Sequence, residues 1–136
     1  MLILTADDVR KALPMRDAIE AMKSAYASLS GGRAVVPLRT RLPIPPHKGL
    51  SLFMPAYVQT ETSEALVVKI VSLFPENPKH GLAFIQAAVL VLEADTGRAL
   101  ALMEGSSLTA IRTGAGSGAA IDILARPNSR VLAVFG

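Results

Sequence analysis

The spacing of the apolar residues changes at Gly31 and Gly32, and this change limits the class of fold that the chain can adopt. Before the two glycines, apolar side chains recur about every 3.6 residues, as on one face of an amphipathic helix. After them, apolar residues alternate with polar ones or form short continuous blocks, which is typical of strands. Helical spacing returns only near Leu108. Helices and strands are therefore segregated along the chain, which predicts an α+β fold with a mostly antiparallel sheet.

Two N-terminal helices, about five strands and one long C-terminal helix are expected, with a short strand at each end. The first helix begins at Thr5, because a Thr followed three residues later by an acidic residue is a capping pattern. Pro14 ends this helix, and the second helix continues to the two glycines. The remaining expected elements are strands Leu2–Leu4, Val36–Ile44, Leu50–Val58, Ala65–Phe74, Leu82–Leu92 and Arg98–Met103, a helix from Leu108 to about Arg126, and a last strand Val131–Phe135.

Composition excludes several classes of protein. Half of the residues are hydrophobic (51%) and 18% are charged, which excludes an intrinsically disordered chain. The absence of Cys excludes a disulfide scaffold, and with two His as well it argues against a structural metal site. The longest strongly apolar stretch, Leu82–Leu92, is far shorter than the roughly 20 residues of a membrane-spanning helix. With no signal-peptide pattern at the N-terminus, we expect a cytoplasmic protein with no membrane association.

Charge and hydropathy indicate what the surface can bind. The formal net charge is +3 (14 − 11), without a basic stripe interleaved with aromatic residues, so nucleic-acid binding is not expected. Mean hydropathy is +0.41, which is high for a chain of 136 residues. Part of the apolar surface is therefore expected to cover an interface with a second chain or a further domain.

Lys69 is the first candidate functional residue. It lies in the middle of a predicted strand that is apolar on both faces, where an unpaired ammonium is costly. Such a lysine is expected to face a cavity or a partner, and it can bind a carboxylate or act as an acid or base. The alternative is a lysine on an edge strand, whose stem lies on the sheet while its tip reaches water.

Three arginines are further candidates. Arg39 and Arg41, two residues apart, project from the same side of a predicted strand, and arginine can hold a carboxylate through two parallel hydrogen bonds. The alternative is a solvated outer face. Arg112 lies early in the predicted C-terminal helix, whose glycines at 114, 116 and 118 indicate close approach of another backbone or of a ligand. Tight helix packing with a surface arginine is the alternative for this segment.

Two segments bear on a dinucleotide cofactor. Gly114, Gly116 and Ala119 match the G-x-G-x-x-A pattern, but no apolar strand precedes them, so we reject this match as a phosphate-binding turn. The apolar run Val131–Phe135 followed by Gly136 is typical of the first strand and first glycine of a dinucleotide-binding unit.

These segments, taken in order, resemble the ornithine cyclodeaminase/mu-crystallin family. The resemblance covers nearly the whole chain, and the segment from Leu108 to Gly114 (LTAIRTG) is its most specific part. The matching segments are Pro37–Thr40 (PLRT), Met54–Tyr57 (MPAY), Lys69–Ser72 (KIVS), Pro75–Asn77 (PEN), Asp95–Gly97 (DTG), Leu108–Gly114 and Leu124–Asn128 (LARPN).

The resemblance implies a homodimer of two-domain subunits that use NAD or NADP on amino or imino acids. Residues 1–129 would form an α+β substrate-binding and dimerisation domain, and residues 130–136 would begin a Rossmann domain, the rest of which would lie in cis or on a companion chain. The substrate carboxylate would be held by Arg39 (or Arg41), Lys69 and Arg112. Lys69 would also be the catalytic residue, and Arg112 and Thr113 would lie near the cofactor, which these residues alone would not hold.

The expected function is therefore that of the N-terminal half of an oxidoreductase or lyase. Ornithine cyclodeamination, alanine dehydrogenation and cyclic imino-acid reduction are the activities that the resemblance implies, while this half alone is not expected to turn over substrate. The alternative is a non-catalytic small-ligand-binding protein, similar to the crystallin member of the family.

Overall fold

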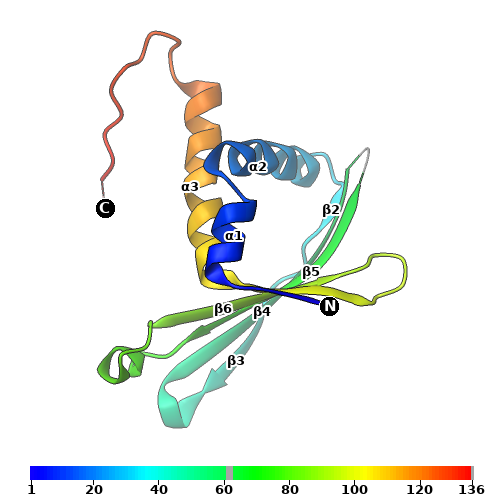
Figure 1. The fold of residues 1–136 in the computed structure, drawn as a ribbon, viewed down its shortest axis with the longest axis vertical. Coiled ribbons are helices and arrows are strands. Elements are labelled where there is room, and N and C mark those ends of the chain that lie inside the picture. The colour runs from blue at the N-terminus through cyan, green and yellow to red at the C-terminus, as the bar shows by residue number, and fades with distance from the viewer. Residues whose placement is uncertain (61–62, 136) are drawn as a thin grey trace.

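One face of a mixed seven-stranded sheet carries three helices (Figure 1). The structure is a computed structural model that describes residues 1–60 and 63–135. The strand order is β1-β7-β6-β5-β4-β2, with β3 also paired to β4. Only β1 and β7 run parallel among these pairs; the others are antiparallel. The elements are β1 Leu2–Leu4, α1 Ala6–Ala12, α2 Met15–Ser30, β2 Ala34–Val35, β3 Thr40–Ile44, η1 Pro45–His47, β4 Gly49–Gln59, β5 Glu64–Leu73, η2 Asn77–His80, β6 Ile85–Leu92, β7 Ala99–Glu104 and α3 Gly105–Leu124.

The α+β fold and the order of its elements are confirmed, with corrections to two of the strands. The strand expected over Val36–Ile44 is formed only over Thr40–Ile44 (β3), and a separate strand of two residues, β2, precedes the expected range. Between them lies Pro37, which has no N–H to donate to a neighbouring strand. The strand expected over Val131–Phe135 is not formed, and the segment turns back beyond α3 and lies apart from the sheet (Figure 1). Val131 and Phe135 are 91% and 92% exposed, because no described strand lies beside them to complete a ladder.

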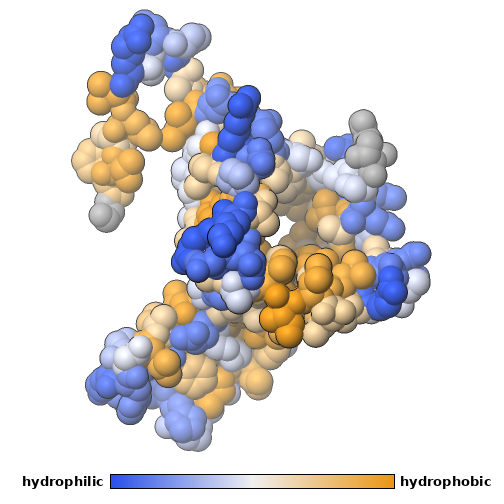
Figure 2. Space-filling view, in the orientation of Figure 1, coloured by the Kyte–Doolittle hydropathy of each residue, from blue (hydrophilic) through white to orange (hydrophobic). Residues whose placement is uncertain are grey.

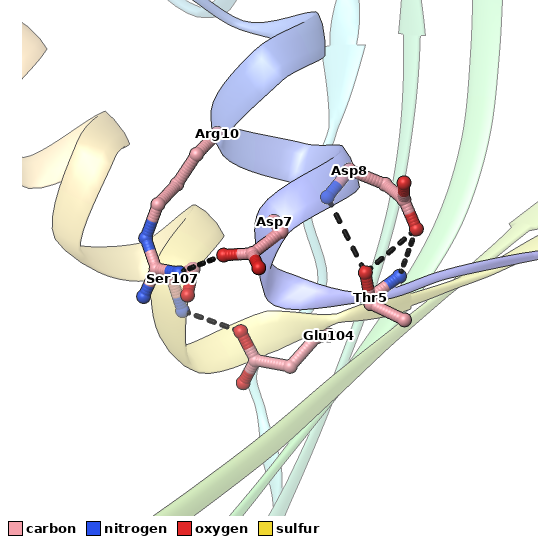
Figure 3. Close-up of polar contacts among 6 residues, drawn as sticks. All are labelled: Thr5, Asp7, Asp8, Arg10, Glu104 and Ser107. Carbon is pink, nitrogen blue, oxygen red and sulfur yellow. Dashed lines mark hydrogen bonds and ion pairs between the residues drawn. The ribbon is translucent and has the colours of Figure 1, made fainter.

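Both ends of α1 follow from the sequence. Thr5 is the N-cap, and its hydroxyl oxygen accepts a hydrogen bond from the backbone N–H of Asp8 at 3.3 Å (Figure 3). The Asp8 carboxylate in turn accepts from the backbone N–H of Thr5 at 2.9 Å. This reciprocal pair is the capping box that the Thr5–Asp8 spacing predicts.

The start of α3 differs from the expectation. The helix begins at Gly105, three residues before Leu108, and β7 runs directly into it. Glu104 is its N-cap, and its carboxylate accepts hydrogen bonds from the backbone N–H groups of Ser106 (2.7 Å) and Ser107 (2.8 Å). Figure 3 shows the bond from Ser107. Desolvation would raise the pKa of Glu104, but these hydrogen bonds outweigh it and lower the pKa to about 2 from 4.5. The ionised form of the Glu104 carboxylate therefore stabilises α3.

Glu104→Gln is expected to lower the free energy of unfolding by about 1 kcal/mol at pH 7, because an amide is a weaker helix cap than a carboxylate. Since folding lowers the pKa of Glu104, its contribution is present above pH 4.5 and is lost as the pH falls towards 2. Urea unfolding between pH 7 and pH 3 should therefore show the wild type and variant converging. Glu76→Gln, which alters only an exposed pair with Lys79, is the control. A difference that stays constant with pH would contradict this role of Glu104.

Close packing of α2 against α3 explains two of the three glycines at 114, 116 and 118. A Cβ atom at Gly116 would lie 2.9 Å from the Tyr26 hydroxyl oxygen, and one at Gly118 would lie 2.7 Å from Ile19 Cδ1. The Lys23 ammonium pairs with Asp122 across the same interface. At these two positions the alternative of tight helix packing is confirmed, because the approaching groups are side chains of α2 and not another backbone or a ligand.

The sheet face opposite the helices, which we call the open face, is apolar. Successive side chains of a strand point to opposite faces of the sheet. Residues that alternate along β4–β7 with the helix-facing ones therefore lie on the open face, as the strand registers show. Among residues 1–60 and 63–135 no helix packs on it (Figure 1), and Ile70 is 36% exposed. Hydrophobic surface also gathers around β1, where Leu2 and Ile3 are exposed (Figure 2). The apolar part of the open face consists of Phe53, Pro55, Val68, Ile70, Leu90 and Leu102, and the same register also places Ser51, Ser72 and Gln86 on this face.

No helix in the described part of the chain is long and apolar enough to cross a membrane.

Candidate functional site

A cleft of about 770 Å³ lies between the first half of α3 and the helix-bearing face of the sheet. One wall is built by β4, β5 and the start of β6, and the other by residues of α3. Its mouth is open to solvent, and its size is in the range of small-molecule sites. It is lined by Arg39, Leu52, Met54, Lys69, Val71, Ile85, Ser106, Thr109, Ala110, Arg112, Thr113 and Gly114.

Strand register brings Lys69 into this cleft. Lys69 lies in the middle of β5, opposite Met54 on β4 and Val89 on β6. Residues opposite one another in an antiparallel pair project from the same face, so Lys69 and Met54 both face α3. Because β5 lies between β4 and β6, the alternative of an edge-strand lysine is wrong, and the expectation that Lys69 faces a cavity is confirmed.

The Lys69 ammonium is half-buried and has a hydroxyl for a partner. Its Nζ atom donates a hydrogen bond to Thr109 Oγ1 at 2.6 Å. Burial lowers the pKa of Lys69, and the positive charge of Arg112 lowers it further. No carboxylate is among the residues that line the cleft. The side chains that line the cleft therefore supply no anion to compensate the charge of Lys69.

Arg39 and Arg112 enter the cleft from two other elements. Arg39 lies in the segment just before β3, and Arg112 lies in the third turn of α3. Neither guanidinium makes an ion pair with a residue in the ranges 1–60 and 63–135. Arg41, the other candidate, lies in β3 and is not among the lining residues. Of the two residues, the geometry thus selects Arg39, and it brings three cationic side chains to one cavity.

The residues expected near a cofactor also line the cleft. Thr113 follows Arg112 on α3, and its hydroxyl donates a hydrogen bond to the carbonyl of Thr109 at 2.7 Å. Its oxygen lone pairs remain able to accept. The glycines of the G-x-G-x-x-A pattern lie inside α3, so they do not form a phosphate-binding turn.

Sequence reasoning missed the apolar wall and the role of one hydroxyl. The wall is built by β4, β5 and β6 and consists of Leu52, Met54, Val71 and Ile85. The hydroxyl belongs to Thr109, which lies three residues before Arg112 on α3 and is the hydrogen-bond partner of Lys69. Pairing the two predicted strands as a hairpin would have placed Met54 opposite Lys69. No local pattern signals the Lys69–Thr109 contact, which joins residues 40 positions apart.

No group of three or more His, Asp or Glu side chains suited to a metal ion occurs within the described ranges.

Comparison with known proteins gives a consistent set of relatives. The profile of the ornithine cyclodeaminase/mu-crystallin family matches residues 1–136. A Δ1-pyrroline-2-carboxylate reductase of Bacillus cereus is 40% identical over 136 residues, which is 100% of this chain and 41% of the relative.

Solved structures show the same fold. The Δ1-pyrroline-2-carboxylate reductase of Thermococcus litoralis, solved with NADH and L-proline, superposes with a TM-score of 0.85 at 48% identity, covering 96% of this chain and 40% of that one. An archaeal alanine dehydrogenase dimer with bound NAD superposes with a TM-score of 0.83 at 33% identity, covering 95% and 38%. The chain thus spans about two fifths of the length of these relatives.

Proposed function

This chain belongs to the ornithine cyclodeaminase/mu-crystallin family, and from that premise we propose that it is the substrate-binding part of an NAD(P)-dependent enzyme acting on amino or imino acids. The observation that carries the proposal is the unbalanced charge of the cleft. Three cationic side chains, Arg39, Lys69 and Arg112, line it, and no lining residue is acidic. A substrate carboxylate supplies the missing negative charge and can accept hydrogen bonds from all three.

The nicotinamide cofactor, when bound, supplies or accepts the hydride in such a reaction. Arg112 and Thr113 are suited to contact it, because both are exposed at the cleft and lie beside the proposed carboxylate site. A Rossmann domain, in cis or on a companion chain, would hold the rest of the cofactor. The relatives in complex with NADH or NAD support this expectation, and the choice between NAD and NADP stays open.

Lys69 has two roles in this proposal. Its ammonium binds the carboxylate, and its lowered pKa makes it a suitable acid or base for a proton on the substrate nitrogen or its neighbour. Proton transfer at this position would need no further titratable group from the cleft.

A cyclic imino acid is the substrate class that fits the cleft best. Beyond the three cations, the sheet side of the cleft is apolar, formed by Leu52, Met54, Val71 and Ile85. A five-membered ring can pack on this wall, whereas the second amine of ornithine would lie there unpaired. The relationship to two Δ1-pyrroline-2-carboxylate reductases supports reduction of a cyclic imino acid over ornithine cyclodeamination.

A second copy of the chain is the partner that fits the open face. The archaeal alanine dehydrogenase is described as a dimer, and the apolar open face is the kind of surface that homodimers bury. Light scattering should give twice the 14.3 kDa mass of one chain, and a single-chain mass at micromolar concentration would contradict a homodimer.

Titration calorimetry tests the carboxylate site directly. L-Proline is expected to bind, L-ornithine at least about tenfold more weakly, and L-prolinamide, which lacks the carboxylate, not measurably. Equal binding of L-proline and L-prolinamide would overturn the proposed site.

Turnover distinguishes the alternative, a non-catalytic binding protein, from the proposed enzyme. With a nicotinamide-binding domain present, oxidation of NADH or NADPH in the presence of Δ1-pyrroline-2-carboxylate is expected. Ligand binding without such turnover would favour the mu-crystallin-like alternative.

A further inference from the structure

We propose that Thr109 is a positioning residue for Lys69, fixing the direction in which the ammonium presents its free N–H groups to a bound carboxylate. This inference rests on the proposed function and extends it to a residue that acts on the ligand through Lys69. It follows from the hydrogen-bond direction, the anchoring of α3 and the charges around Lys69.

Hydrogen-bond direction defines the role of the hydroxyl. Thr109 Oγ1 donates its one proton to the backbone carbonyl of Gly105 at 2.6 Å. Towards Lys69 it can therefore only accept, and Lys69 Nζ donates to it at 2.6 Å. An ammonium has three N–H donors, so one is used by Thr109 and two remain for a ligand. The three groups form a chain in which Lys69 donates to Thr109 and Thr109 donates to Gly105, so the direction of both hydrogen bonds is defined.

The position of Thr109 is itself fixed by the packing of α3 on the sheet. Gly105 is buried, and a Cβ atom there would lie 2.7 Å from the backbone carbon of Ala87 on β6. The carbonyl that orients the Thr109 hydroxyl thus belongs to a residue of α3 that lies against the backbone of β6. Because the helix cannot approach further at this point, the height of the hydroxyl above β5 is determined by backbone contact and not by a flexible side chain.

Other groups around Lys69 oppose its charge or are neutral. Arg112 faces it from α3 and Arg39 lines the same cleft from the segment before β3, and both are cationic. Met54 and Val89, its cross-strand neighbours on β4 and β6, are apolar. Within the lining of the cleft, Thr109 is therefore the group seen to accept a hydrogen bond from the ammonium. Its removal would take away the acceptor that fixes the direction of the ammonium, and the loss of that hydrogen bond disfavours the charged form of Lys69.

Thr109→Val and Thr109→Ser test this role. Valine keeps the shape but removes the acceptor, while serine keeps the hydroxyl. In the ligand-free protein, an NMR titration of the Lys69 side chain should show a lower pKa in Thr109→Val than in the wild type, and a near wild-type pKa in Thr109→Ser. Affinity for L-proline should fall about tenfold in Thr109→Val and less than threefold in Thr109→Ser.

The controls separate this proposal from the proposed function. Ser117→Ala removes a hydroxyl that hydrogen-bonds a backbone carbonyl of the same helix but does not contact Lys69, and it should leave the Lys69 titration unchanged. If Thr109→Val does not fold, Thr109→Ala provides the same comparison. A Lys69 pKa that is unchanged in the valine or alanine variant overturns the role of Thr109. Failure of the wild type to bind L-proline overturns the carboxylate site instead, since the ligand-free titration does not depend on it.

Discussion

Lys69→Met is expected to weaken the binding of L-proline by about 100-fold. The ammonium is the central cation of the cleft, and a hydrogen bond from a charged group contributes about 1.5–3 kcal/mol to binding. Methionine keeps an unbranched side chain of similar length, so the apolar contacts with Met54 and Val89 are largely retained. Arg39 and Arg112 remain, and residual weak binding of the carboxylate is therefore expected.

The same substitution is expected to stabilise the fold slightly. Folding lowers the pKa of Lys69, so its ammonium destabilises the folded state at neutral pH, and this cost decreases as the pH rises through the lowered pKa. Removing the charge should raise the free energy of unfolding by up to about 1 kcal/mol at pH 7. Urea unfolding measures this change, and calorimetry measures the loss of binding.

A loss of function together with a gain in stability would identify Lys69 as a residue kept for its ligand. Lys79→Met, at an exposed lysine of η2 that lies outside the cleft, is the matched control and should change neither quantity appreciably. Affinity for L-proline within threefold of the wild type in Lys69→Met would remove Lys69 from the site.

The cleft illustrates what a sequence can predict about a site of this kind. The segments containing Arg39, Lys69 and Arg112 were recognisable from local patterns and from the family resemblance, and the structure brings all three to one cavity. The choice between Arg39 and Arg41 was not predictable. The sequence places both on the same side of one strand, whereas in the structure Arg39 lies just before β3 and lines the cleft, and Arg41 lies in β3 and does not.

Elements that depend on a partner were predicted least well. Val131–Phe135 has the composition of a buried strand, but a strand forms only where another strand offers its donors and acceptors.

The sequence predicts the start of α3 three residues late because Gly105, Ser106 and Ser107 are common in loops. Glu104 reverses this preference by accepting hydrogen bonds from the first free N–H groups of the helix.

Gly105→Ala is expected to cause the largest loss of stability among single substitutions in α3, about 3 kcal/mol. Its new Cβ atom would lie 2.7 Å from the backbone carbon and 2.8 Å from the backbone nitrogen of the Ala87–Ala88 peptide bond on β6. Neither atom belongs to a side chain that can rotate away, so the helix must move off the sheet, and overpacking of this kind costs about 1–3 kcal/mol or more. The better helix propensity of alanine, about 1 kcal/mol, offsets only part of this cost.

Gly114→Ala, on the same helix, is the matched control because its Cβ atom would meet only the flexible end of Met15, at 3.5 Å. This variant should be as stable as the wild type or more stable by up to about 1 kcal/mol. Displacement of α3 in Gly105→Ala would also carry the Thr109 hydroxyl away from Lys69, so the pKa of Lys69 should shift in that variant. Thermal unfolding and the Lys69 titration together distinguish a moved helix from a merely weakened one. If Gly105→Ala proved as stable as Gly114→Ala, the contact between α3 and β6 would not be what sets the geometry of the cleft.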